Sequence, residues 1–169
     1  RAVTKGLEGS LFAYKTGMTA TATGVLEHLA RETGGAVFSV VNEAEVNSAA
    51  TAHRRRAWKL LDVAVPGGSD LLVAGRPQYI YPGQSLMVGG RGKPDAEASL
   101  RVRRGEQEKV IEVRFDRVVP SELAPRAYGQ VSVGQLEELG SDLDDVAVAY
   151  ARHFRVTGRT CSLLMLESE

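Results

Sequence analysis

One pair of side chains in this sequence could carry out nucleophilic catalysis. Cys161 is the only cysteine of the chain, and His153 shortly precedes it. A thiolate beside an imidazole base is the pair that cysteine hydrolases and transferases use. Cys161 also opens an apolar run, which is typical of a buried structural cysteine. We therefore predict no catalytic residue, and a cysteine-dependent hydrolase or transferase that uses Cys161 and His153 is the alternative.

The sharpest charge run is His53-Arg54-Arg55-Arg56. Such a run could contact a phosphate group or an acidic partner. It also falls at the end of a predicted helix, where cations interact favourably with the helix dipole. The helix-end interpretation is favoured, and His53, Arg54, Arg55 and Arg56 are retained as candidate contacts for a partner or an anion.

Two further patterns resemble metal or phosphate sites but depart from the required spacing. Asp142, Asp144 and Asp145 lack the glycine and the distal glutamate of a calcium-binding loop. The run Gly89-Gly90-Arg91-Gly92 precedes a predicted strand, whereas a phosphate-binding loop leads into a helix. We expect the acidic residues to cap a helix, and we predict no metal and no cofactor for this sequence.

Aromatic side chains offer another type of site. Trp58, Tyr79, Tyr81 and Tyr128 would form a surface for a partner if they were exposed. Trp58 stands where the sequence pattern changes, so we expect it to anchor the junction between two parts of the chain.

Composition limits the class of protein. The 169 residues include 21 lysines and arginines and 21 aspartates and glutamates, which gives a formal net charge of zero. Nucleic-acid binders normally carry a basic excess, so no nucleic acid is expected as a partner. No apolar run approaches the roughly 18 residues of a membrane span. The chain starts at Arg1 without a signal-like segment, and we interpret it as part of a longer polypeptide.

Residues 1–57 alternate between strand and helix patterns. Apolar runs at 11–14 and 36–41 predict strands, and residues 24–33 and 43–57 predict helices. The second run is apolar throughout, which is typical of a strand that is buried on both faces. This order of elements favours the end of a parallel α/β sheet.

From Trp58 the pattern has a period of two residues, with turns between the runs. Strands are predicted at residues 60–65, 70–81, 85–88, 99–103 and 110–115. Tyr81-Pro82-Gly83-Gln84 has the composition of a type II turn. Residues 58–118 are therefore expected to form a small antiparallel β-sandwich. Cross-strand pairing with Glu106, Glu108 and Glu112 is expected for its arginines, which are Arg101, Arg103, Arg104 and Arg114.

Helical patterns return in residues 119–169. One helix is expected up to about Leu139, with interruptions at Gly129 and Gly134, and a second starts at Ser141. The expected apolar face of the second helix comprises Leu143, Val146, Ala147, Tyr150 and Phe154. The run from Cys161 to Leu166 predicts a closing strand. This segment should therefore be a helical pair whose closing strand packs on the sandwich.

Two stretches carry a family resemblance. Phe154 and Ser162-Leu163-Leu164-Met165-Leu166-Glu167 resemble the C-terminal end of bacterial proteins that pair a VIT (vault and inter-α-trypsin) domain with a von Willebrand factor A domain. Residues 70–77, the Pro-Gly-Gln turn and Gly90-Arg91 are similar to part of the β-sandwich of these proteins, whose relatives include the inter-α-trypsin inhibitor heavy chains. Residues 157–161 depart from the family pattern.

The resemblance implies a fold and a context. The predicted fold class is α+β: the last strand–helix elements of a von Willebrand A-like α/β domain, then a small antiparallel β-sandwich, then a helical hairpin with a closing strand. The metal-binding motif of such A domains, Asp-x-Ser-x-Ser, does not occur in the sequence, so metal-dependent adhesion is not assigned. By family resemblance the parent protein is expected at the cell surface or secreted.

These observations favour one function. We predict a non-enzymatic protein-interaction or scaffold module of a larger von Willebrand A-type protein. Its expected partners are an unidentified protein and the upstream domains of the same polypeptide.

Overall fold

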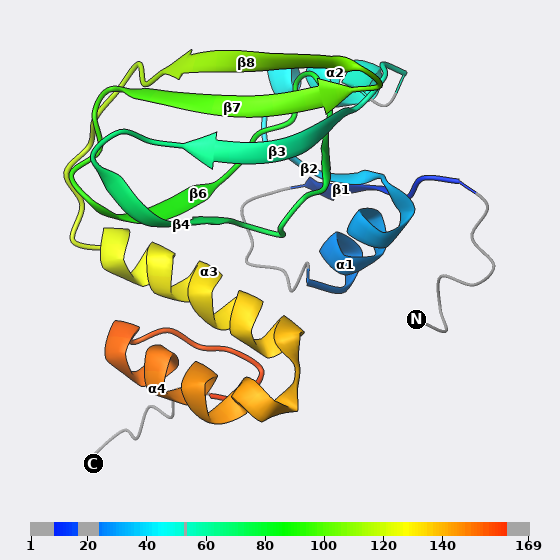
Figure 1. Ribbon diagram of the computed structural model, residues 1–169. Helices are drawn as coiled ribbons and strands as arrows, with labels where there is room; N and C mark the ends of the chain where they lie inside the picture. The colour runs from blue at the N-terminus through cyan, green and yellow to red at the C-terminus, as the bar shows by residue number, and fades with distance from the viewer. Residues whose placement is uncertain (1–8, 17–23, 53, 162–169) are drawn as a thin grey trace.

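The computed structural model describes residues 9–16, 24–52 and 54–161, which form an α+β fold (Figure 1). The strands are β1 (Phe12–Thr16), β2 (Ala36–Val40), β3 (Trp58–Ala64), β4 (Gly68–Val73), β5 (Tyr79–Ile80), β6 (Val88–Gly92), β7 (Glu97–Arg104) and β8 (Gln107–Arg114). The helices are α1 (Gly24–Thr33), α2 (Glu43–Ala52), α3 (Ala124–Leu139) and α4 (Asp144–Phe154), with a 3₁₀ turn η1 (Ser141–Leu143) before α4. Strand–helix elements thus come first, antiparallel strands second and a helical hairpin last, as the sequence predicts.

The first part of the chain contains a parallel strand pair. β1 lies beside β2 with Phe12 opposite Ala36, and α1 connects the two strands with the predicted bounds 24–33. Ala36 and Phe38 of β2 are buried against α2. Ser39 is exposed on the other face, which opens onto a crevice of about 230 Å³. The prediction that this strand is buried on both faces is therefore wrong.

α2 begins as predicted but ends earlier. The Glu45 N–H donates to the Asn42 side-chain oxygen at 2.9 Å, and the Val41 N–H donates to the Glu45 carboxylate at 2.8 Å. These bonds satisfy two donors at the start of the helix. The predicted end at residue 57 is wrong, because α2 ends at Ala52 and Arg54 already lies in a turn.

The middle of the chain forms two antiparallel sheets. A four-stranded sheet has the order β5-β3-β7-β8, and β4 pairs with β6 beneath it (Figure 1). Trp58, Ile80 and Val102 form the core of the four-stranded sheet. The predicted strand 70–81 is two strands, because Gly75 and Arg76 have φ angles of 70° and 43° between β4 and β5. The turn at residues 81–84 is confirmed by the Gln84 N–H, which donates to the Tyr81 carbonyl at 3.1 Å.

The arginines of the four-stranded sheet do not all have the predicted role. Arg103 lies 3.9 Å from Glu108, whereas Arg101 and Arg114 pair with Asp62 and Glu97. Arg104 instead lies over the ring of Trp58, with 4.1 Å between the guanidinium carbon and the ring centroid. Strand alternation explains this difference, because neighbouring residues point to opposite faces of a sheet.

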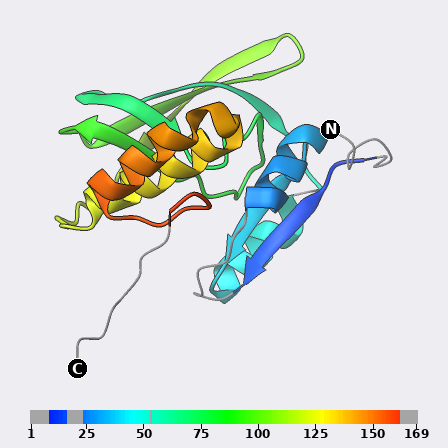
Figure 2. The ribbon, with the colours of Figure 1, turned by 90° about the horizontal axis from the view of Figure 1, so that it is seen from below.

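The last part is a pair of packed helices. α3 continues through Gly129 and Gly134, so the predicted interruptions are wrong. A side chain on Gly129 would overlap Phe154 of α4, which explains the glycine by close packing of the two helices. α3 covers the β4–β6 pair, α4 lies beside α3, and the strand–helix elements of the first part lie to one side (Figures 1 and 2).

The expected apolar face of α4 is only partly correct. Ala147 and Ala151 are buried, but Val146 and Tyr150 are 41% and 40% exposed. The buried stripe therefore passes through Ala151, a residue outside the predicted face. Val146 and Tyr150 are exposed because the buried stripe of α4 already faces α3 and the segment that follows α4.

Polar contacts join the three parts of the chain. Glu138 of α3 pairs with Arg31 of α1 at 3.2 Å and with Arg76 of the β4–β5 loop at 2.7 Å. The Tyr81 hydroxyl donates to the Gly34 carbonyl at 2.7 Å. These contacts hold the three parts of the chain in one arrangement.

The predicted closing strand lies mostly outside the described residues. Cys161 itself is described and lies outside regular secondary structure. Among the helices of the described ranges, none is both long enough and apolar enough to cross a membrane.

Candidate functional site

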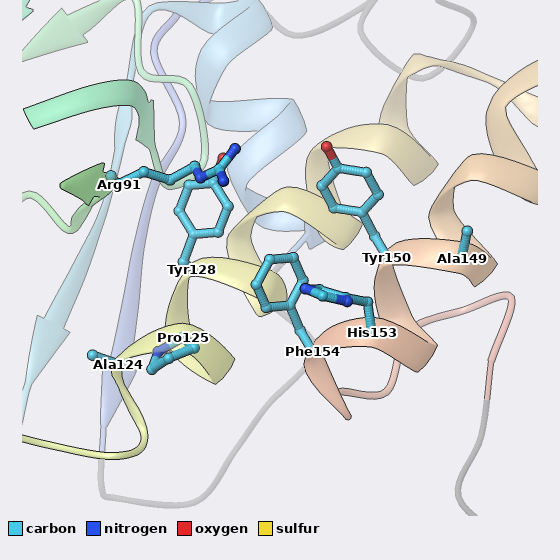
Figure 3. A pocket seen from close by; sticks show the side chains of 9 residues that line it. Arg91, Ala124, Pro125, Tyr128, Ala149, Tyr150, His153 and Phe154 are labelled. Carbon is cyan, nitrogen blue, oxygen red and sulfur yellow. The ribbon is translucent and has the colours of Figure 1, made fainter.

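An aromatic groove of about 600 Å³ lies between β6, α3 and α4 (Figure 3). We call this depression the aromatic groove. It is lined by Gly90, Arg91, Ala124, Pro125, Tyr128, Ala149, Tyr150, His153 and Phe154. Most of these side chains are apolar or aromatic, with few polar groups at the rim. Concave sites that bind partners or ligands commonly have this composition.

Packing between the two helices fixes the aromatic rings. Close approach at Gly129 brings the Tyr128 ring within 5.6 Å of the Phe154 ring, at an interplanar angle of 66°. Tyr150 and His153 also contact Phe154, with ring centroids 5.8 Å and 4.6 Å away. Edge-to-face contacts of this kind stabilise a fixed ring geometry. The groove therefore presents aromatic surface that is already ordered.

Two glycines let β6 approach its neighbours. A side chain on Gly89 would touch the ring of Tyr128, and one on Gly90 would press against Leu71. The sequence pattern predicts a break between strands at Gly89-Gly90-Arg91-Gly92. The run belongs to β6 instead, where small residues leave room for α3 and for the side wall of the groove.

One cation stands at the rim of the groove. Arg91 lies 3.4 Å from Asp70, and the two side chains are 69% and 60% exposed. An ion pair with this exposure contributes little to stability. The guanidinium is thus accessible to an acidic group on a partner.

A hydrogen-bonded carboxylate holds the segment behind α4. The backbone N–H and the hydroxyl of Thr160 both donate to one Glu137 oxygen, at 2.8 Å each. Burial raises the pKa of Glu137, but the hydrogen bonds from Thr160 and Arg159, together with the charge of Arg159, outweigh it, so the pKa lies below its ordinary value. This contact fixes Thr160 and the segment around it behind α4.

The structure does not bring Cys161 and His153 together. Cys161 packs against the buried cluster of Val133, Ala151 and Val156, whereas His153 lines the groove. Ala151 and His153 lie about 160° apart around α4, at 3.6 residues per turn. No hydrogen bond within the described residues joins the thiol to the imidazole. The geometry therefore does not support a cysteine-dependent hydrolase or transferase that uses Cys161 and His153.

The basic run lies at the end of α2. His53 is outside the described residues, and Arg54, Arg55 and Arg56 are exposed. The Arg54 and Arg55 N–H groups donate to Thr51 and Ala52 carbonyls, which ends the helix. Within the described ranges, none of the three arginines forms an ion pair.

The acidic residues at the start of α4 have other roles than metal binding. Asp144 pairs with Arg159 at 3.0 Å, and Asp142 and Asp145 are exposed. The expected side-chain cap is absent at the described start of α4, although the carboxylates still lie at the positive end of the helix. In the part of the chain that the structure describes, no group of His, Cys, Asp and Glu side chains gathers around a common point.

Sequence patterns indicate only part of the aromatic groove. Of the four aromatic candidates, Tyr128 lines it, whereas Trp58 and Tyr81 are buried elsewhere. Tyr150 and Phe154 are expected from helical spacing in the core of the helical pair. The exposed position of Tyr150 follows from the way α4 turns toward α3, which no local pattern encodes.

Comparison of the chain with protein-family models, curated proteins and solved structures gives no match. The functional conclusion therefore depends on the geometry of the groove and its neighbours.

Proposed function

We propose that the chain is a non-enzymatic protein-interaction and scaffold module, and that the aromatic groove receives a segment of its protein partner. The groove itself is the observation that carries this proposal. It combines ordered tyrosine and phenylalanine rings with an accessible arginine. Tyrosine and arginine are enriched among the residues that dominate binding energy at protein interfaces.

The partner segment that fits this groove has a defined chemistry. An apolar side chain would pack between Tyr128, Tyr150 and Phe154, where it loses contact with water. An acidic side chain next to it would reach the guanidinium of Arg91 at the rim. We therefore propose a short segment with an apolar anchor and a neighbouring carboxylate.

We further propose that the module belongs to a larger von Willebrand A-type protein at the cell surface or outside the cell. The parallel pair β1–β2 with α1 and α2 supports this, because the last part of such a domain would supply these elements. A sheet of two strands is marginally stable by itself. Val25, Val41 and Val46 are exposed on this part and would contact upstream domains of the same polypeptide.

Selection from a random peptide display library tests the groove and does not require the partner to be identified first. Peptides selected on the folded chain should contain an apolar residue next to an acidic one. Tyr150→Ala should weaken their binding by about tenfold, or about 1.4 kcal/mol, because the variant removes half-exposed aromatic surface. Calorimetry or fluorescence anisotropy measures this change.

Tyr14→Ala is the matched control, because Tyr14 is 45% exposed but lies on β1, away from the groove. It should leave the affinity of the selected peptides unchanged. Selection that enriches no peptide, or peptides that bind the Tyr150→Ala variant with full affinity, would contradict the proposal.

A further inference from the structure

Strand β8 forms one edge of the four-stranded sheet, whose order is β5-β3-β7-β8 (Figure 1). Every residue of β8 except Ile111 is exposed. In the part of the chain that the structure describes, no strand pairs with the outer side of β8. This side therefore presents backbone donors and acceptors with which a further strand can pair.

The opposite edge of the same sheet is protected from such pairing. β5 is only two residues long, and Pro77 and Pro82 lie within two residues of its ends. Proline has no backbone N–H, and short strands next to prolines are a common protection of sheet edges. The Tyr81 N–H, which follows β5, donates to the Gln84 side chain at 3.1 Å. β8 contains neither proline nor glycine, so of the two edges it is the one that offers long strand pairing.

The β7–β8 ladder shows which backbone groups of β8 face outward. The Phe115 N–H donates to the Ala96 carbonyl at 2.9 Å, and the register then continues without a shift to the hairpin turn. In an antiparallel pair, alternate residues turn their N–H and C=O groups toward the partner strand. Since Phe115 faces β7, the residues that face outward are Glu108, Val110, Glu112 and Arg114. A strand added to β8 must bond to these residues.

Charged side chains of the hairpin are complementary to a second copy of the same hairpin. Glu108 lies 3.9 Å from Arg103 of β7, and Arg114 lies 3.2 Å from Glu97 of β7. Two copies of β8 can pair antiparallel about a two-fold axis at Ile111, which sets Glu108 of each copy opposite Arg114 of the other. Across the four strands, the row then reads Arg103, Glu108, Arg114 and Glu97, with alternating sign. Opposite charges directly across a strand pair stabilise it.

Neighbouring registers bring like charges together. An axis at Val110 would set Glu108 opposite Glu112, and an axis at Glu112 would set this residue opposite its own copy. An axis at Lys109 would likewise oppose two lysines, and like charges directly opposite destabilise a sheet. An axis between two residues would set outward-facing backbone groups opposite inward-facing ones. The sequence of β8 thus favours the register centred on Ile111.

The same register continues the apolar core from one copy to the other. Ile111 packs on the buried cluster of the four-stranded sheet and lies opposite Leu100 of β7. At the axis the two Ile111 residues would form a non-hydrogen-bonded pair, with about 4.5 Å between their Cα atoms. Lys109, which shares this face, lies 4.4 Å from the ring centroid of Trp58 and is thus engaged within its own copy. Pairing therefore removes apolar surface from water without opposing two lysines.

We propose that β8 pairs antiparallel with β8 of a second copy of this chain, in a two-fold symmetric dimer whose sheet is continuous through both copies. Each copy supplies the same surface, as two-fold symmetry requires. The paired segment is short, so we expect a dissociation constant of roughly 10 μM to 1 mM. β8 contributes no lining residue to the aromatic groove, and the dimer does not rest on the function proposed for the groove.

Charge reversal at the two ends of the pair tests both the dimer and its register. Glu108→Arg would set arginine opposite Arg114 twice, and Arg114→Glu would set glutamate opposite Glu108 twice. Each variant alone should dimerise at least about tenfold more weakly than the original protein. Mixing the two variants in equal amounts should restore the dimer, because every arginine in the mixed pair again faces a glutamate. Sedimentation equilibrium from about 5 μM to about 1 mM measures these affinities.

Val110→Pro tests the backbone pairing, because it removes a donor that faces away from β7. It should also weaken the dimer by at least about tenfold. Val110→Thr is the matched control, since threonine keeps the N–H and the β-branched shape. This control should change the dissociation constant by less than about threefold. Circular dichroism checks that each variant is folded.

Three results would overturn the proposal. The first is a chain that stays monomeric up to about 1 mM. The second is a dimer that both charge reversals leave unchanged, or that mixing them fails to restore. The third is a dimer that Tyr150→Ala abolishes, because Tyr150 lines the aromatic groove and the contact would then lie there. We expect Tyr150→Ala to dimerise as tightly as the original protein.

Discussion

The aromatic groove and a second depression, which lies where β3 begins and β7 turns into β8, have nearly the same volume, about 600 and 660 Å³, but different linings. Tyr128, Tyr150 and Phe154 dominate the first. The second is lined mainly by charged residues of both signs, which are Lys59, Arg103, Arg104, Glu106 and Glu108. Volume alone therefore says nothing about what each depression binds. The lining decides, because apolar side chains favour a ligand that is stabilised by leaving water, whereas charged side chains favour a polar or charged one.

The two depressions also differ in how the chain builds them. The second depression follows from strand register, which places Lys59 opposite Arg103. The groove depends on helix packing at Gly129, where α4 approaches α3. Disturbing the helix packing should therefore leave the four-stranded sheet intact, and the first of the three predictions below tests this separation.

The largest effect is expected for Gly129→Ala. The added methyl group would overlap Phe154, and overpacking of this kind lowers the free energy of unfolding by about 1–3 kcal/mol. Peptide binding to the groove should weaken, whereas the fluorescence of Trp58 in the core of the four-stranded sheet should not change. Urea unfolding, the peptide-binding assay and Trp58 fluorescence measure these outcomes.

Gly134→Ala is the control in the same helix. No atom lies within 4 Å of a side chain placed there, so the change should stabilise α3 by up to about 1 kcal/mol. Equal effects of the two substitutions would show that helix propensity, and not the contact with Phe154, determines the effect of the substitution at Gly129.

A smaller effect, dependent on pH, is expected for Glu137→Gln. The pKa of Glu137 is lowered in the folded state, so its carboxylate stabilises the fold above the ordinary value of 4.5, and this stability is lost as the pH falls through the folded-state pKa. The variant should be less stable by about 1 kcal/mol at neutral pH, because Glu137 is partly exposed. Urea unfolding across the acidic range should show that the free energies of unfolding of the variant and the original protein converge as the pH falls.

Glu122→Gln controls for the loss of a negative charge, because Glu122 is exposed just before α3. The Glu122→Gln variant should be as stable as the original protein at neutral pH. A constant difference between Glu137→Gln and the original protein down to the most acidic pH would contradict the role of the carboxylate.

The smallest effect concerns Cys161, which is half-buried behind α4 and not in the groove. Its reaction with a thiol reagent should be roughly tenfold slower than that of an unfolded control. His153→Ala, which alters the groove, should leave this rate unchanged. A sharp fall in the rate would instead indicate that His153 activates the thiol, as the alternative enzyme requires.

Local patterns in the sequence are sufficient for much of the secondary structure. Residues 24–33 form the predicted helix, and the antiparallel part begins at Trp58 as expected. Such features depend on neighbouring residues, namely apolar spacing, capping side chains and turn composition. The basic run also follows the end of a helix as predicted, although that helix ends at Ala52 and not at residue 57.

Local patterns mislead where distant residues decide the outcome. Glycine weakens a helix, so Gly129 predicts an interruption, but contact with Phe154 requires a glycine there. Residues 89–92 predict a break for the same reason and instead form part of β6. In both cases glycine permits close packing, which a local pattern does not reveal.

By itself, the sequence determined the α+β class, the order of its three parts and the presence of a charge run without acidic neighbours. Tertiary structure alone decided that Tyr128, Tyr150 and Phe154 meet in a groove. It also placed Cys161 and His153 on different sides of α4. The physical reason is that hydrogen-bonded turns and helices form between near neighbours, whereas the groove forms between side chains that only packing brings together.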